Sequence, residues 1–190
     1  VPGEGPNQPM GEGRGIYPGR VVWVHDPKAT SWDGKTGYWW EDANTDPTVV
    51  GEMVSRSLHA LTGRDSDAAA WDALFRNFNS RRGKGDVGYQ PGEKIAVKLN
   101  LNQVGGYGSL QNRSVAGPQI VLAYLRQLVN VAGVSDADIA LYDASRYVPS
   151  ELLTPVRAEF PNVRFIAWGG GRGREKYARD PDVRVHWSAQ

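Results

Sequence analysis

The sequence predicts an α/β fold with an open, mainly parallel, doubly wound sheet of four or five strands and helices on both of its faces. Short runs of β-branched and aromatic residues alternate with longer stretches whose apolar residues recur at helical spacing. Strands that alternate with helices in this way pair in parallel. With 190 residues and no cysteine, the chain is long enough to bury an apolar core without disulfides.

The chain is predicted to consist of an N-terminal arm followed by one domain. Residues 1–19 carry repeated Gly and Pro and few apolar side chains, which is typical of an arm or linker. We expect a single α/β domain over residues 20–190. Its first strand is predicted at residues 20–26 (RVVWVHD), a β-branched and aromatic run. Three tryptophans in apolar patterns are expected in the core: Trp23, Trp71 and Trp168.

An aromatic loop at residues 27–44 is rich in Trp, Tyr, Gly and Asp. It forms either an exposed stacking platform or a lid packed over the first helices. Packing is favoured, because Trp39 and Trp40 directly precede a helix and can fix its start.

Two helices follow the loop. The first, at residues 47–62, has an N-cap at position 45 or 46, Pro47 in its first turn and Gly63 as its stop. The second is predicted at about 67–80, with its large apolar residues on one face.

The second half alternates strands and helices. Residues 93–102 (EKIAVKLNLN) alternate strictly between apolar and polar side chains, as a strand does. The remaining elements are predicted as a helix at 117–132, a strand at 138–143, a helix at 149–160, a strand at 162–168 and a candidate fifth strand at 183–187.

Ligands of open parallel sheets bind beyond the carboxyl ends of the strands, so the residues there are the site candidates. Lys and Arg supply positive charge and Gly lets backbone amides approach, so this rim suits a small carboxylate or phosphate. The candidates for ligand binding are Asn100, Asn102, Asp143, Ser145, Arg146, Gly170 and Arg172. The candidates for acid–base catalysis are Lys98 and His25, and Asp26 is the candidate metal ligand.

Each candidate also has a structural interpretation. His25 can be a strand-end histidine bonded to the backbone, and Lys98 can face solvent on an edge strand. Ser145 can form a turn that caps the next helix. The run at residues 169–174 (GGGRGR) fits neither the dinucleotide fingerprint nor a P-loop, so it is either an anion-binding loop or a plain surface loop.

The composition excludes several classes of function. Lys plus Arg number 22 and Asp plus Glu 21, a net charge of +1 without long runs of one sign, which argues against a nucleic-acid partner. Without cysteine there is no thiol nucleophile or zinc ribbon. No stretch approaches the ~20 apolar residues of a membrane span. The sequence starts at Val1, and we expect a processed product or an excised piece, a cleaved export signal being one explanation.

Several separated motifs resemble the DUF362 family, a bacterial family named for its unknown function. They occur in the family's order between about residues 20 and 180: WWEDANTDPTVVGEM, AWDALFRNFN, GYQPGEKIAVKLNLN, PQIVLAYLRQLVNVAGV, ADIALYDASR and EFPNVRF. The resemblance implies an α/β domain and, for many members, export to the periplasm or beyond. The family's Lys-x-Asn element corresponds to Lys98 and Asn100. Family members continue into a second half, so this chain is expected to be of about half length.

A shorter likeness concerns residues 143–149 (DASRYVP), which look like the Asp-x-Thr-Arg-x-x-Pro element of lactate-racemase-like enzymes. In those enzymes the acidic residue and the arginine help hold a hydroxy acid beside a nickel-containing nucleotide cofactor.

The sequence therefore predicts an extracytoplasmic bacterial module that binds a ligand or serves as a structural subunit. Its expected partners are a small anion, another protein subunit or the missing C-terminal half. The sequence does not identify a cofactor. The alternative is an enzyme, isomerase-like or metal-assisted, in which Lys98 or His25 moves a proton and Arg146 holds a carboxylate or phosphate.

Overall fold

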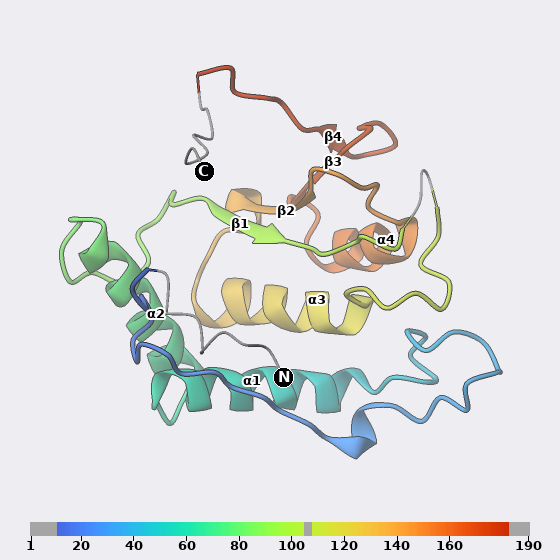
Figure 1. Cartoon of the computed structure of the whole chain (residues 1–190), viewed down its shortest axis with the longest axis horizontal. Helices are drawn as coiled ribbons and strands as arrows, with labels where there is room; N and C mark the ends of the chain where they lie inside the picture. Colours follow the sequence, from blue (N-terminus) through green and yellow to red (C-terminus); the bar gives the residue numbers. More distant parts are fainter. Residues whose placement is uncertain (1–10, 105–107, 183–190) are drawn as a thin grey trace, which may run out of the picture. The chain divides into compact units, whose positions relative to one another are not determined.

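The computed structural model describes residues 11–104 and 108–182, and the chain falls into two compact units (Figure 1). Unit 1 consists of Val1–Glu93 and Ala123–Val134, and unit 2 of Lys94–Leu122 and Ser135–Gln190. Residues 20–190, expected to form one domain, are thus spread over both units. No helix in the described ranges has the length and apolar character needed to cross a membrane.

Unit 1 is built on two capped helices. The first, α1 (Pro47–Thr62), begins where the Asp46 side chain accepts hydrogen bonds from two backbone N–H groups and ends at Gly63, which is left-handed with φ 65°. These ends confirm the prediction. The second, α2 (Asp67–Arg81), is capped by Ser66. Two short elements complete the unit: the 3-10 turn η1 (Pro27–Ala29) and the π-helical turn η2 (Gln127–Val131).

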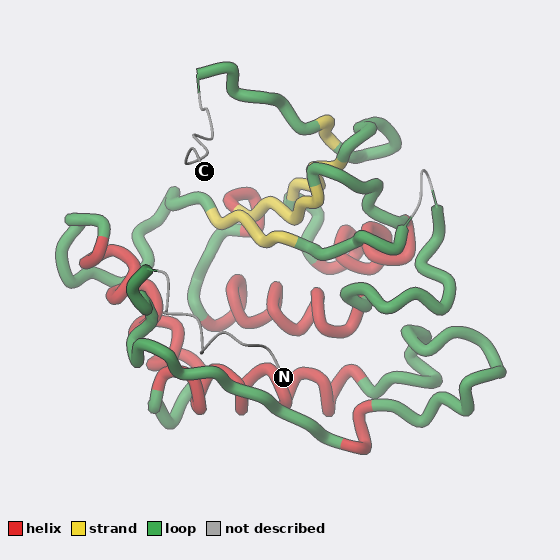
Figure 2. The backbone as a smooth tube through the Cα atoms, viewed as in Figure 1, coloured by secondary structure: helices red, strands yellow, loops and turns green. Residues whose placement is uncertain are grey.

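The prediction of a strand at residues 20–26 is wrong. This segment pairs with no strand of the described chain, and its Trp23, expected in the core, is 83 % exposed. The segment instead lies along α1, to which both of its ends are attached. The Arg20 guanidinium donates to the Ala60 carbonyl of α1, and Asp26 pairs with Arg56 of α1. Figure 2 shows residues 11–46 mostly as loop.

Unit 2 contains a sheet of four parallel strands in the order β1-β2-β3-β4, which confirms the α/β class. The strands are β1 (Ile95–Lys98), β2 (Ile139–Asp143), β3 (Arg164–Ala167) and β4 (Glu175–Lys176). In this sheet the strands lie side by side in the same order as in the chain. The described sheet therefore has no point at which the strand order reverses, which is where open α/β sheets commonly bind ligands, and the candidate rim rests on its side chains alone.

Helices and short turns connect these strands. The helix α3 (Pro118–Arg126) begins in unit 2 and ends within the segment assigned to unit 1. The 3-10 turn η3 (Asp136–Asp138) leads into β2, and α4 (Ser150–Glu159) connects β2 to β3. Fully buried apolar side chains of unit 2 form its core, among them Leu101, Leu110, Ile139, Leu141, Leu152, Val156 and Phe165.

Three expectations for this unit need correction or fall outside it. The strand predicted over residues 93–102 ends at Lys98. Trp168, expected in the core, is 52 % exposed, because it follows the last residue of β3. The short strand β4 was not predicted, and the candidate strand at 183–187 lies outside the described residues.

Candidate functional site

The carboxyl ends of β1 and β2 bring Lys98 and Asp143 together. Asp143 is the last residue of β2 and its side chain is fully buried, whereas the Lys98 side chain, at the end of β1, is 48 % exposed. Lys98 Nζ lies 3.0 Å from Asp143 Oδ2 and also donates to the Leu99 carbonyl. The ion pair therefore joins a buried anion to a cation at the surface.

Both oxygens of Asp143 are fully used as acceptors. Oδ2 also accepts from the Leu101 N–H at 3.0 Å, and Oδ1 accepts from the N–H and the hydroxyl of Ser145 at 2.9 and 2.8 Å. Burial by itself would raise the pKa of Asp143, but these hydrogen bonds and the one from Lys98 outweigh it and lower the pKa to about 2. Asp143 is thus ionised at neutral pH and organises the groups around it.

Local sequence explains why the chain turns here. The Asp-Ala-Ser sequence lets the aspartate accept from the backbone two residues later, which is a common way to start a turn. The Leu101 N–H donates to the Asp143 carboxylate, and β1 is shorter than the alternating pattern predicts. The Leu101 side chain is fully buried in the core.

Arg146 extends the rim toward the loop after β1. Its Nε donates to the Asn102 carbonyl at 3.2 Å and its Nη1 to the Ser145 carbonyl at 3.1 Å. Its own carbonyl accepts from the Trp168 N–H beyond β3, so it is tied to three strand ends. Its Nη2 donates no hydrogen bond within residues 11–104 and 108–182.

The two asparagines contribute less than the sequence suggests. Asn100 Oδ1 accepts from the Asn102 N–H at a long 3.4 Å, which shapes the loop, and both residues are exposed. The rim thus consists of Lys98, Asp143, Ser145 and Arg146, with the asparagines beside it. Its formal charge is +1, from two cations and one carboxylate.

The glycine-rich loop after β3 has a structural reason for its composition. Gly170, Gly171, Arg172 and Gly173 all have positive φ values, of 62°, 77°, 50° and 83°. A Cβ on Gly170 would lie 2.9 Å from the Lys176 backbone nitrogen, so only glycine fits where the chain returns to form β4. The predicted ligand-binding role of Gly170 and Arg172 stays a prediction.

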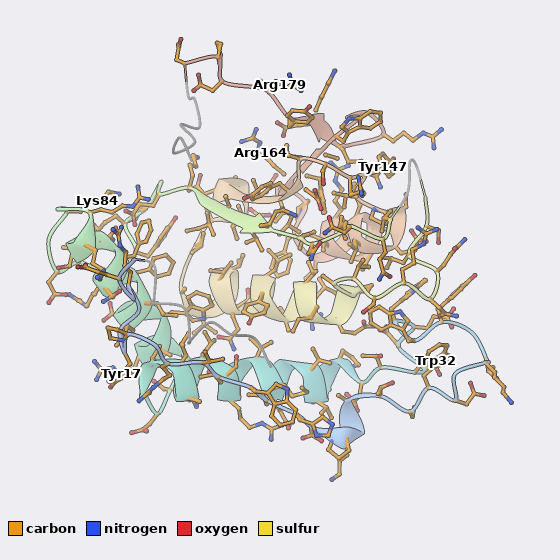
Figure 3. All side chains as sticks on the ribbon, viewed as in Figure 1. Tyr17, Trp32, Lys84, Tyr147, Arg164 and Arg179 are labelled. Atoms are coloured by element: carbon orange, nitrogen blue, oxygen red, sulfur yellow. The ribbon has the colours of Figure 1, made fainter. Side chains whose placement is uncertain are left out.

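The neighbouring Arg174 is a structural arginine. It is buried and donates to the Val148 carbonyl through Nε and Nη2, at 2.9 and 2.7 Å. Its guanidinium lies 4.5 Å from the centre of the Tyr147 ring, which Figure 3 labels. Its hydrogen bonds fix the loop against the start of α4.

His25 and Asp26 belong to unit 1 and not to the unit that holds the rim. The His25 ring stacks on Trp23, with centroids 5.5 Å apart. Asp26 caps η1 by accepting from the Lys28 N–H and pairs with Arg56 at 2.8 Å; the Arg56 hydrogen bond is the main cause of its lowered pKa. Within the described ranges no cluster of His, Asp and Glu could hold a metal ion, and the metal role of Asp26 stays a prediction.

The aromatic loop at 27–44 folds largely on itself. Trp32 Nε1 donates to the Thr36 carbonyl at 3.1 Å, and the Asp33 carboxylate accepts from two backbone N–H groups of the same turn. Tyr38 and Trp40 stack with centroids 5.3 Å apart. The side chains of Trp39 and Trp40 are half-buried.

Sequence reasoning missed a polar network in unit 1. Asp67 accepts from the Ser55 hydroxyl and the Gln127 amide, both at 2.6 Å, and lies 2.9 Å from His59 Nε2. Burial opposes ionisation, but these contacts outweigh it and lower the pKa of Asp67. Gln127 accepts from Trp71 Nε1 at 3.0 Å. Gln127 is 60 positions from Asp67 and 56 from Trp71 in the sequence, so no local sequence pattern predicts these contacts.

A groove of about 350 Å³ also lies within unit 1, lined by Trp71, Phe75 and Tyr89 together with the ion pair of Asp72 and Arg76. The Tyr89 hydroxyl is buried and makes no hydrogen bond within the described chain. The sequence had indicated only a helix face here.

Comparisons of the chain with models of protein families, with curated proteins and with solved structures gave no significant match. The likeness to the DUF362 family stays a prediction that the sequence motifs carry.

Proposed function

We propose that this protein is a binding module whose rim of Lys98, Ser145 and Arg146 takes a small anion such as a carboxylate or phosphate. The observation that carries the proposal is the fixed Lys98–Asp143 ion pair, in which a saturated, buried carboxylate holds an exposed ammonium at the strand ends. One N–H of that ammonium and Nη2 of Arg146 are left over after the hydrogen bonds of the described chain. These two donors are the expected ligand contacts.

The same geometry argues for binding rather than for catalysis. As a general base, Lys98 would have to be neutral, and it would then lack the positive charge that pairs with the buried Asp143 carboxylate. In the racemase-like alternative an acidic residue at position 143 contacts substrate, but both Asp143 oxygens already accept two hydrogen bonds each. An enzyme of this kind would need to dismantle the turn that forms its site.

The experiment is calorimetric titration with phosphate, sulfate, acetate and citrate at low ionic strength. Arg146→Gln and Lys98→Gln each remove a charged donor, which is worth about 1.5–3 kcal/mol and so weakens binding roughly 10-fold to 100-fold.

The matched control is Lys94→Gln. Lys94 precedes β1 at the opposite end of the strand and pairs with Asp138, so its loss should leave the affinity unchanged. The proposal fails if none of the four anions binds saturably, or if Lys94→Gln weakens binding as much as the rim variants do.

We further propose that the protein acts outside the bacterial cytoplasm and associates with another subunit or a second half. The support is the resemblance of the motifs at residues 88–102 and 118–134 to the DUF362 family. Fractionation of the source bacterium with an antibody to this chain tests the location. Detection only in the cytoplasmic fraction would reject it.

A further inference from the structure

Residues 20–26 of unit 1 form an extended segment with the side-chain pattern of a strand. Val21 and Trp23 are 90 % and 83 % exposed and His25 is exposed beside them, whereas Val22 and Val24, between them, are half-buried. The parallel stack of the Trp23 and His25 rings shows that side chains two apart share the outer face.

The backbone of this segment is unpaired. Within residues 11–104 and 108–182, the backbone of Val21 to His25 makes no hydrogen bond, and only the ends are fixed, by the contacts of Arg20 and Asp26 with α1. Figure 3 labels Tyr17, on whose ring the Arg20 guanidinium rests at 3.8 Å. A β-branched and aromatic strand with bare N–H and C=O groups is a template for another strand.

The segment is complementary to itself in charge. If two copies align antiparallel so that residue numbers of opposite residues add to 46, Arg20 faces Asp26 of the second copy at both ends. Val21 then faces His25, and Trp23 faces Trp23 on the twofold axis. Pro18 and Pro27 lack an N–H and limit the pairing to this stretch.

We propose that residues 20–26 are the dimerisation strand of this protein and that they pair antiparallel with the same residues of a second copy, centred on Trp23. The pairing satisfies the backbone groups along one edge of the segment and packs the exposed Val21 and Trp23 side chains against those of the second copy. It also places opposite charges across both ends, where cross-strand pairs stabilise a sheet. The twofold contact is isologous, so it closes at two copies and does not propagate.

Single cysteines test the register, because these 190 residues contain none. Trp23→Cys alone should form a covalent dimer on mild oxidation. Val21→Cys and His25→Cys should each form little covalent dimer alone but should crosslink when mixed, at least tenfold more than either alone. Ser80→Cys, exposed on α2, is the control for random collision. Crosslinking of Trp23→Cys no faster than that of Ser80→Cys, or efficient crosslinking of Val21→Cys with itself, would overturn the proposal.

Introducing a charge at the axis tests the dimer without covalent chemistry. Trp23 is so exposed that Trp23→Lys and Trp23→Glu should fold as the parent does, which circular dichroism verifies. By sedimentation velocity the parent should approach twice its 20.8 kDa mass as concentration rises. Each variant should stay monomeric, since like charges then meet at the axis, and an equal mixture of the two should dimerise again.

A parent that remains monomeric up to millimolar concentration would refute self-association. A parent dimer that both single variants retain would place the interface elsewhere and refute it as well.

Discussion

Replacing Asp143 by asparagine should cost far more stability than the same change in the ion pair at the other end of the same strands. The asparagine turns one acceptor oxygen into an NH₂ donor that faces donors such as the Leu101 N–H, and an unsatisfied buried group costs about 1–3 kcal/mol. The lowering of the Asp143 pKa from 3.8 to about 2 corresponds to roughly 2 kcal/mol. The same hydrogen bonds underlie both effects, so the two free energies are not added. The expected loss of stability is about 3 kcal/mol, the upper end of the first range.

Asp138→Asn is the matched control. Asp138 pairs with Lys94, whose side chain is 73 % exposed, and a pair with such an exposed partner contributes about 1 kcal/mol or less. Urea denaturation at neutral pH, followed by circular dichroism, measures both variants against the parent. A loss below about 1 kcal/mol for Asp143→Asn would refute the reasoning, as would equal losses for the two variants.

The pH dependence follows from the sign of the pKa change. Because the folded-state pKa of Asp143 lies below its ordinary value, folding holds the group ionised, and its contribution is complete above about pH 4 and lost as the pH falls toward about 2. The stability difference between the parent and Asp143→Asn should therefore be constant near neutrality and should shrink in that acid range. A difference that stays constant down to about pH 2 would contradict the assigned hydrogen bonds.

Three further changes test the local explanations by thermal and urea denaturation. Gly170→Ala should destabilise by about 3 kcal/mol, from left-handed strain and a clash with the β4 backbone, whereas Gly171→Ala, with open space around it, should cost about 1–2 kcal/mol; equal losses would discount the clash. Asp46→Ala should cost about 1 kcal/mol through the lost cap of α1, and an unchanged midpoint would deny the cap any role. Asp67→Asn should cost about 1–2 kcal/mol because a donor then faces the Gln127 amide, and a stabilised variant would contradict the network.

Features that depend on neighbouring residues were predictable from the sequence. The start of α1 at Pro47 and its stop at Gly63 follow from capping residues within one turn of the helix ends. Asp143 at the end of β2 follows from the rule that polar groups gather at the carboxyl ends of parallel strands. In each case the physics is contained in a few consecutive side chains.

Features that depend on distant partners were not predictable. Residues 20–26 have the composition of a buried strand, but composition does not say whether a neighbouring strand exists, and none does within the described chain. The alternating pattern ran past Lys98, yet β1 ends there. The last bond to β2 comes from the Leu99 N–H, and the Leu101 N–H donates instead to the side chain of Asp143, which is distant in sequence. The contact of Asp67 with Gln127 joins residues 60 positions apart, which no local pattern can reveal.

The central claim, that the rim at the ends of β1 and β2 binds an anion, is tested most directly by nuclear magnetic resonance. The measurement is a titration of ¹⁵N-labelled protein with phosphate that follows backbone amides and arginine Nε–H signals. The account predicts saturable shifts at Ser145, Arg146 and the amide of Leu101, with none at Lys94 or Asp138. Shifts confined to the groove around Trp71, or no saturable shift at the rim, would contradict it.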